Sequence, residues 1–559
     1  MTNDKRKLDV FENLINSLGD FGPYQQWQYA LCVISVIVSG MQMYSLLTVA
    51  AIPEHRCEIP HIDVNKTMTE LNFTTLTRYI PLKTETQIDS CHIYDTITNE
   101  SVKCNSWVYN TTYHPSSRAI EWNFVCDRRW MGAVSQTTFM LGIFLGNILL
   151  GNLADRIGRK PVFCCTALMT LLFGVGVAFT TDFYMFLAMK FVLGMAACAG
   201  STLAGFVMTM ELVGPSRRSV VGIGFQVFFA IGIVLVAFWG YLIKDRQQLQ
   251  IIYGLHSLPL VFHWWLLDES PRWLWAKGRY RESLEIIQKA LRFNGSKMIL
   301  DMEKLIPKES ALDPNKSQND TGLLESFKRP NLRTRILNVG FMWFGNSLVY
   351  YGLSLSTKSM KGNPFLVIFI MGIIELPADL LVVIFLDRMG RRFITSFNMI
   401  ISGLCCVLAV AFTIGSLTSN ILVYLGKFTI AASFSAIYIY SAELFPTMIR
   451  NSAMGFASMC ARISGSLTPF ITLLDSFDPK IPCIIFGVIT IFSGFLVVFL
   501  PETVGTDMPT TIEDGEKFGI GDTCFSNFFA RKQMKSYKVN DEISMMEEQL
   551  ETLNVKEKI

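Results

Sequence analysis

The sequence predicts an all-α membrane protein whose helices form two bundles of six, and three observations support this fold class. The 559 residues are 51% hydrophobic and only 17% charged, with a mean hydropathy of +0.36, which is typical of a chain that crosses the membrane many times. Apolar runs of about 18 to 25 residues recur along the chain, and each can cross a hydrocarbon core of about 30 Å. Two short motifs also occur twice at the same spacing.

Twelve apolar runs are predicted to be membrane helices, six in each half of the chain. Their approximate bounds are 28–52, 132–153, 161–180, 184–210, 219–243, 251–268, 334–357, 365–386, 393–414, 420–441, 452–474 and 482–500. The first thirty residues carry mixed charge and no short apolar region followed by a cleavage site, so we expect no signal peptide and a cytoplasmic N-terminus.

Basic residues in the short loops predict the orientation. They are concentrated at 155–160, 216–218 and 387–392 and in the long segment 269–333, all of which fall on one side of the membrane. Positive loops favour the cytoplasm. We therefore expect both termini to be cytoplasmic in a multi-pass protein of the plasma membrane.

The loop 53–131 falls on the opposite side, and its contents agree with an extracellular position. It contains four cysteines, which allow two disulfides in three possible pairings that the sequence does not rank. It also contains four sequons for glycosylation. These residues are Cys57, Cys91, Cys104 and Cys126, and Asn65, Asn72, Asn99 and Asn110.

An internal repeat divides the chain into two halves. "LADRIGRK" contains Asp155 and "FLDRMGRR" contains Asp387, 232 positions later; Glu211 and Glu443 have the same separation. Parallel repeats are typical of transporters that rock two halves about a central site. The predicted parts are a cytoplasmic N-terminus (1–27), an N-terminal bundle (28–268), a cytoplasmic linker (269–333), a C-terminal bundle (334–500) and a cytoplasmic tail (501–559). Within the linker, the apolar spacing of 281–293 predicts a short amphipathic helix.

Four stretches carry a resemblance to a known family. "GNLADRIGRK" resembles the signature loop of the major facilitator superfamily. "ESPRWLWAKGR" (269–279), "AELFPTMIRN" (442–451) and "PETVGTDMPTTIED" (501–514), together with the long first loop, resemble the organic cation, organic anion and carnitine transporters of solute carrier family 22. The resemblance covers about residues 19 to 514. It implies the twelve-helix major facilitator fold and transport by alternating access.

The repeated charged residues are candidates for a gate. The resemblance implies that two charge networks at the cytoplasmic helix ends lock the halves together in the outward-facing state. The alternative is that they only set the topology and form solvated ion pairs, which contribute little. The residues are Asp155, Arg159, Glu211 and Arg218 in one half and Asp387, Arg391, Glu443 and Arg450 in the other.

Two acids inside the run 365–386 are the first candidates for substrate contact. Glu375 and Asp379 are four residues apart and so share one helix face, with Pro377 loosening the turn between them. Ionisable groups within a membrane segment are costly and usually serve function. The resemblance places Glu375 where cation and carnitine transporters have a glutamate, and Asp379 where anion transporters have a lysine, which argues against a simple anion carrier.

Arg462, in the run 452–474, is the opposite charge. The resemblance implies an aspartate here in cation transporters and an arginine in anion and carnitine transporters. The planar guanidinium suits a carboxylate, so Glu375 and Arg462 together predict a receptor for organic zwitterions or cations similar to carnitine, betaine, carcinine or β-alanine. Two alternatives stay open: that Glu375 and Arg462 pair with each other as a bridge between the halves, and that the protein is an organic anion exchanger using Arg462.

Further contacts are implied by the same resemblance. Aromatic rings attract alkylammonium groups, although an aromatic at helical spacing is as often a packing residue. The candidates are Phe206, Gln226, Phe229, Trp343 and Tyr350. Lys190 and Lys427 are expected to extend to the membrane interface.

The sequence argues against other function classes. It contains no P-loop, no GxSxG motif and no metal-ligand cluster, so we expect neither an enzyme nor a cofactor. The predicted partners are a small organic solute, the lipid bilayer and Na⁺ or H⁺ as a coupling ion. We expect a monomer that does not bind nucleic acid.

Overall fold

A computed structural model gives the fold. It describes residues 11, 14–15, 17–59, 62–63, 68, 73–84, 87–95, 98, 100–214, 217–300, 305, 326–355, 360, 362–413, 415–446, 449–506, 509 and 511–519. These residues contain helices at all twelve predicted positions.

The N-terminal half supplies the first six positions. They are occupied by α2 (Pro23–Tyr44) with α3 (Leu46–Val49), α6 (Trp130–Ile157), α7 (Arg159–Gly176), α8 (Phe183–Gly194) continued by η3 (Met195–Thr202) and α9 (Leu203–Leu212), α10 (Arg218–Leu242), and α11 (Arg246–Leu255) with α12 (Leu258–Val261) and α13 (His263–Leu266). The prediction of one helix over 251–268 is wrong. Pro259 lies in the first turn of α12 and has no N–H to continue α11.

The C-terminal half supplies the other six positions. They are α18 (Pro330–Leu355), α19 (Pro364–Ile373) with α20 (Glu375–Met389), α21 (Arg391–Ala409), α22 (Leu417–Leu444), α23 (Arg450–Leu473) and α24 (Ile481–Val497). By length and composition, eight spans of the described chain are long and apolar enough to cross a membrane. The sixth position is broken, α24 is shorter, and α18 and α23 carry more polar side chains.

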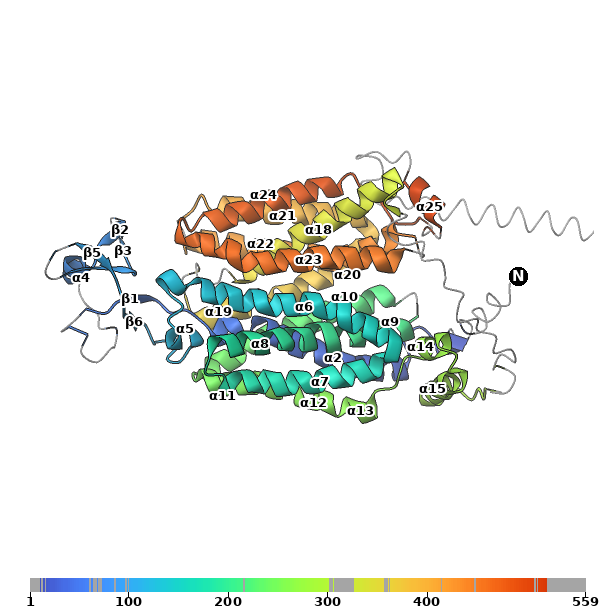
Figure 1. Cartoon of the computed structure of the whole chain (residues 1–559). Helices are drawn as coiled ribbons and strands as arrows, with labels where there is room; N and C mark the ends of the chain where they lie inside the picture. The colour runs from blue at the N-terminus through green and yellow to red at the C-terminus, as the bar shows by residue number, and fades with distance from the viewer. Residues whose placement is uncertain are drawn as a thin grey trace, which may run out of the picture.

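The two halves lie side by side as two layers of helices (Figure 1). They meet where α6 packs against α23 and where α10 packs against α19 and α20. The β-strands project from one end of the bundle, here called the strand end. The opposite end, called the motif end, carries α14 (Pro271–Ala276), α15 (Tyr280–Phe293) and α25 (Ile512–Lys517).

Two glycines show the internal repeat in the backbone. Gly158 and Gly390 adopt φ of +113° and +96°, which favours glycine, at the turns before α7 and α21. A Cβ atom at Gly158 would lie 2.4 Å from Glu269 Oε2, and one at Gly390 would lie 2.6 Å from Glu502 Oε2. Each carboxylate accepts hydrogen bonds from the first two N–H groups of the helix that follows. Both halves therefore use the same glycine turn and the same helix cap.

The amphipathic helix predicted over 281–293 is confirmed as α15. Its apolar positions, Leu284, Ile287, Ala290 and Leu291, are buried. They pack with Trp275 of α14 and Leu18, so the helix covers the motif end of the N-terminal half.

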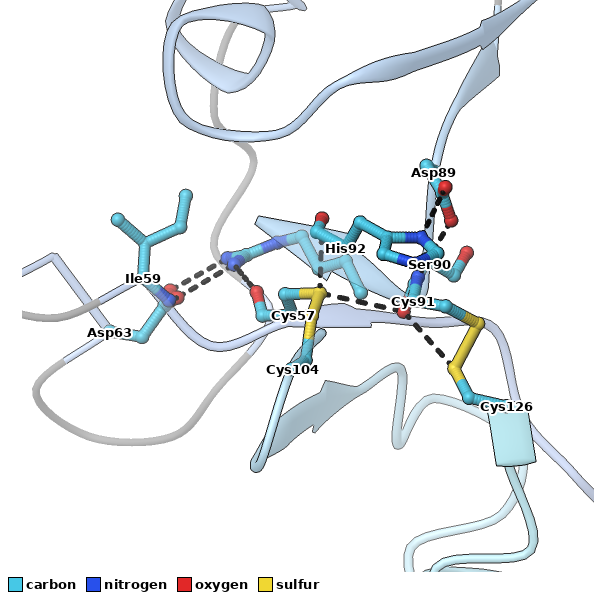
Figure 2. Close-up of a disulfide and its surroundings, with 10 residues drawn as sticks. Cys57, Ile59, Asp63, Asp89, Ser90, Cys91, His92, Cys104 and Cys126 are labelled. Atoms are coloured by element: carbon cyan, nitrogen blue, oxygen red, sulfur yellow. Dashed lines mark hydrogen bonds and ion pairs between the residues drawn. A yellow bond between two sulfur atoms is a disulfide. The ribbon is translucent and has the colours of Figure 1, made fainter. Parts of the chain in front are cut away.

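The loop 53–131 folds as a small unit of antiparallel strand pairs. The pairs are β1 (His55–Cys57) with β6 (Trp107–Tyr109), β2 (Leu82–Thr84) with β3 (Gln87–Ile88), and β4 (His92–Tyr94) with β5 (Ser101–Lys103); it also contains α4 (Phe73–Tyr79) and α5 (Arg118–Glu121). The prediction of two disulfides is confirmed, and the pairs are Cys57–Cys104 and Cys91–Cys126 (Figure 2). Of the four sequons, Asn110 directly follows β6 and is half-buried. Asn65, Asn72 and Asn99 lie outside the described residues.

A buried ion pair stabilises this unit. Both Asp63 carboxylate oxygens accept bonds of 2.6 Å from the Arg56 guanidinium, and one also accepts from the Ile59 N–H at 2.8 Å. Burial alone would raise the pKa of Asp63, but these hydrogen bonds and the charge of Arg56 outweigh it, so the pKa is lowered. The stabilisation is therefore complete above the ordinary aspartate pKa of about 4 and is lost as the pH falls below it.

Asp63→Asn is expected to destabilise the loop by roughly 3–5 kcal/mol at pH 7, because it leaves Arg56 buried without a counter-charge. Limited proteolysis of the full-length protein should show faster cleavage within 53–131. Asp127→Asn is the matched control, since the Asp127–Lys103 pair is exposed and should contribute little. Equal cleavage of the Asp63→Asn variant and the unmodified protein at pH 7 would contradict the prediction.

Candidate substrate site

One face of α20 carries both predicted acids into the bundle. Glu375, Ala378, Asp379 and Val382 are buried, whereas Leu380 on the other side is 59% exposed. α19 ends at Ile373 and α20 begins at Glu375, so that only Ile374 lies between the two helices. Both carboxylates therefore point away from the lipid, as predicted from their spacing.

Glu375 is held by groups from two other helices. The Lys427 ammonium of α22 lies 2.7 Å from its Oε1, and the Tyr350 hydroxyl of α18 donates to Oε2 at 2.8 Å. Lys427 also donates to Ser354 Oγ at 2.7 Å and lies 3.3 Å from the centre of the Tyr350 ring. Glu375 thus has a cation, a hydroxyl and an aromatic face around it.

The expectation that Lys190 and Lys427 extend to the membrane interface is wrong. Both side chains are fully buried. Lys427 stays inside because Glu375 neutralises it, and Lys190 donates to Ser45 Oγ at 3.0 Å and lies near the rings of Phe139 and Phe186. Sequence reasoning missed Lys427 as a site residue, although its place ten residues into α22 was a usable signal.

Asp379 has a different environment from Glu375. The Ser435 hydroxyl of α22 donates to its Oδ1 at 2.5 Å. Its Oδ2 is buried and has no hydrogen-bond partner among the described residues. Asp379 is only 2% exposed. One carboxylate oxygen is therefore available inside the bundle.

Arg462 of α23 approaches the site from a neighbouring helix. Its Nη1 donates to the Tyr351 hydroxyl at 3.4 Å, and its buried Nε has no hydrogen-bond partner among the described residues. The other ionisable groups that face it are Tyr438 of α22 and Cys198 of η3 in the N-terminal half.

The possible bridge between Glu375 and Arg462 is not present in the structure. Glu375 pairs with Lys427, and Arg462 contacts Tyr351. The expectation that such a pair would join the two halves is also wrong, because α20 and α23 both belong to the C-terminal half.

Adjacent tyrosines on α18 connect the acid and the guanidinium. Tyr350 contacts Glu375, Tyr351 contacts Arg462, and the two rings are 5.3 Å apart. Tyr44 of α2, in the N-terminal half, is close enough to Glu375 and Tyr351 to interact with both electrostatically. The opposite charges therefore lie on one aromatic wall that faces the N-terminal half.

The other predicted contacts lie on three helices, α9, α10 and α18. Phe229 lies 6.2 Å from Tyr44, ring centre to ring centre, and so belongs to the same region. Phe206 instead packs edge to face on Phe225 at 5.1 Å. Trp343 is 2% exposed, donates to Ser441 Oγ at 2.9 Å, and has its ring centre 4.5 Å from that of Tyr438. Gln226 is half-buried on α10.

The predicted charge networks form ion pairs at the motif end, and the four pairs that Arg159 and Arg391 make among the described residues each join residues of one half. Arg159 lies 3.0 Å from both Asp155 and Glu211. Arg391 lies 2.8 Å from Asp387 and 3.0 Å from Glu443. The Nε of Arg218 donates to Val213 O, and that of Arg450 to Phe445 O, at the ends of the preceding helices.

At the strand end, contacts join the two halves directly. Arg129, just before α6, lies 2.7 Å from Asp475 and donates to Ser476 Oγ at 2.9 Å, both just after α23. Lys244 lies 4.2 Å from the centre of the Phe365 ring of α19. These contacts connect the two halves at the strand end.

Asp475→Asn is expected to weaken the contact between the halves by roughly 0.5–1 kcal/mol, since the Arg129–Asp475 pair is partly exposed. The native Cys198, which faces Arg462, should then react about two- to fivefold faster with an impermeant thiol reagent applied at the strand end. The charge-swapped protein Arg129→Asp/Asp475→Arg should return to the original rate, and Cys198→Ser gives the background. An unchanged rate for Asp475→Asn would show that the pair does not hold the halves together.

Comparisons with known proteins define the class. A family model described as "Sugar (and other) transporter" matches residues 90–511. The inward-open structure of the xylose transporter XylE from E. coli is similar over 91% of this chain and 99% of that chain, with a TM-score of 0.57 and 14% identity, and a sugar-analogue-bound XylE structure also has a TM-score of 0.57, at 15% identity. The fold is that of a major facilitator superfamily transporter, and not of an enzyme.

Sequence relatives identify the family within that class. The chain is 34% identical over 529 residues to the "Organic cation transporter protein" of Drosophila melanogaster, covering 91% of this chain and 95% of that one. It is 30% identical to the human "Organic cation/carnitine transporter 2" (90% and 93% covered) and 29% identical to the "Beta-alanine transporter" of Drosophila melanogaster (90% and 89% covered). The chain belongs to solute carrier family 22, whose human member 16 is 30% identical to it over 544 residues (91% and 93% covered).

Proposed function

We propose that this protein carries small organic zwitterions or cations, similar to carnitine, betaine, carcinine or β-alanine, across the plasma membrane by alternating access. The observation that carries the proposal is the arrangement of Glu375 and Arg462 on one aromatic wall, linked by Tyr350 and Tyr351. Relatives named for organic cation, carnitine and β-alanine transport support the same substrate class.

The charge balance of the site also favours a zwitterion. Glu375 and Asp379 are opposed by Lys427 and Arg462, so the four groups sum to zero when all are ionised. A zwitterion adds no net charge to this set. The substrate ammonium would compete with Lys427 for Glu375 or occupy the free oxygen of Asp379, and the Arg462 fork would hold the carboxylate. Tyr350 and Phe229 would contact the alkylammonium through their rings.

The proposed cycle uses the two ends of the bundle alternately. The networks that contain the Asp155–Arg159 and Asp387–Arg391 pairs would lock the motif end when the strand end opens. The loop 53–131 would face the extracellular space and both termini the cytoplasm, with Na⁺ or H⁺ as coupling ion and a monomer as the working unit.

An organic anion exchanger is the second candidate. It is favoured by one observation: Lys427 already neutralises Glu375, whereas Arg462 Nε is unpartnered among the described residues. Radiolabelled uptake of carnitine, β-alanine, carcinine, tetraethylammonium and an aryl carboxylate into cells expressing the protein, with and without sodium, separates the two candidates. Uptake of the aryl carboxylate alone would overturn the proposal.

A further inference from the structure

The region around Lys427 contains one more acid than its ammonium can neutralise. Glu375 takes the ion pair with Lys427 at 2.7 Å. Asp379, one helical turn further along α20, receives only the Ser435 hydroxyl and keeps an unpartnered, buried Oδ2. Each acid would need its own counter-charge to remain ionised inside the membrane.

The helices packed against α20 do not supply that second charge. On α22, Lys427 and Ser435 face Asp379, and on its own helix Glu375 faces it. α19 has no charged residue, and α10 has none after Arg218 in its first turn. α21 carries only Arg391 and Arg392, also in its first turn, where Arg391 pairs with Glu443 and the Arg392 guanidinium donates to Leu500 O. Asp379 thus has no cation of its own among the described residues.

An ionised carboxylate in this position costs several kcal/mol, and two events can remove the cost. A proton can bind the carboxylate and leave a neutral acid that keeps its hydrogen bond with Ser435. An organic ammonium can lie against Oδ2 and neutralise the ionised form. Both ligands use the same oxygen, so they exclude each other.

We propose that Asp379 holds a proton in the empty carrier and releases it when the substrate ammonium binds, so that the protein exchanges protons for organic cations. The step balances. The O–H bond at Oδ2 breaks and the proton passes to water on the side where the site is open. The substrate ammonium then neutralises the carboxylate that remains. After release of the substrate on the other side, Asp379 takes up a proton there. One proton moves against each ammonium. This inference rests on the proposed function and names its coupling ion.

The test uses the full-length protein in liposomes that contain a pH-sensitive dye, with tetraethylammonium as the probe. A gradient of one pH unit, acidic inside, is expected to raise the steady-state accumulation of tetraethylammonium about tenfold, since one unit is worth about 1.4 kcal/mol. Uptake should also make the interior more alkaline. With carnitine as probe, the same proton release is expected.

Variants test whether the gradient response and the dye signal depend on Asp379. Asp379→Asn should lose both the response to the gradient and the dye signal, whereas Asp379→Glu should restore them in part. Asp127→Asn, in the exposed pair of the loop, should behave as the unmodified protein. Thermal unfolding of each purified variant shows whether a loss reflects misfolding, and Asp379→Glu keeps the test decisive if Asp379→Asn does not fold.

The outcomes separate the inference from the proposed function. Uptake of tetraethylammonium that is indifferent to the gradient, or driven by sodium instead, would overturn proton exchange and leave the proposed function standing. An unchanged gradient response in Asp379→Asn would overturn the role of Asp379 and also leave the proposed function standing. Absence of uptake of both tetraethylammonium and carnitine would overturn the two together.

Discussion

Glu375→Gln is expected to lower uptake of cations and zwitterions by a factor of about 100 or more. The change removes the acid that recognises the ammonium, and it also leaves Lys427 as a buried cation without its partner at 2.7 Å. Removing one member of a buried ion pair costs roughly 3–5 kcal/mol. The measurement is the initial rate of carnitine and tetraethylammonium uptake, normalised to the amount of protein at the cell surface.

A double variant separates recognition from folding. Glu375→Gln/Lys427→Met removes both charges, so it should recover much of the thermal stability that the single variant loses. It should not recover uptake, because the acid is still missing. Retained or improved uptake of an aryl carboxylate by Glu375→Gln, with no cation transport in the unmodified protein, would favour the anion exchanger.

Arg462→Asp is expected to reduce strongly the uptake of solutes that carry a carboxylate and to spare pure cations such as tetraethylammonium. A charged hydrogen bond to the guanidinium contributes roughly 1.5–3 kcal/mol, so carnitine uptake should fall about 10- to 100-fold. Because Arg462 contacts Tyr351 only at 3.4 Å and its Nε is unpartnered among the described residues, its removal should disturb the fold less than removal of Glu375.

Arg462→Lys is the matched control, since it keeps the charge and loses the planar fork. Carnitine uptake by this variant should lie between those of the unmodified protein and Arg462→Asp. Loss of every substrate in both variants, with normal surface expression, would show that Arg462 has a structural role.

The overall fold was predictable because its signals are local in the sequence. Apolar length placed the twelve segments, and the repeat of Asp155 at Asp387 divided the chain into halves. The break in 251–268 was also within reach, because Pro259 stands in the middle of that run. Disulfide pairing was not, because four cysteines within one loop contain no information about which sulfurs meet.

The candidate site was predictable only in part. The shared face of Glu375 and Asp379 follows from helical spacing, and their burial confirms it. The partner of Glu375 does not follow, because the contact of α20 with Lys427 of α22 depends on helix packing. The error about a bridge between halves has a simpler cause: Glu375 and Arg462 both follow the linker 269–333, and the predicted boundaries already placed them in one bundle.

The decisive measurement compares two solutes that differ only in their carboxylate, carnitine and its methyl ester. Initial uptake of each is measured in the unmodified protein and in Arg462→Asp. If opposite charges on one wall recognise the two ends of a single solute, the unmodified protein prefers carnitine and Arg462→Asp prefers the ester. A variant that takes up both more slowly by the same factor, or an unmodified protein that does not distinguish them, would contradict recognition of the carboxylate by Arg462.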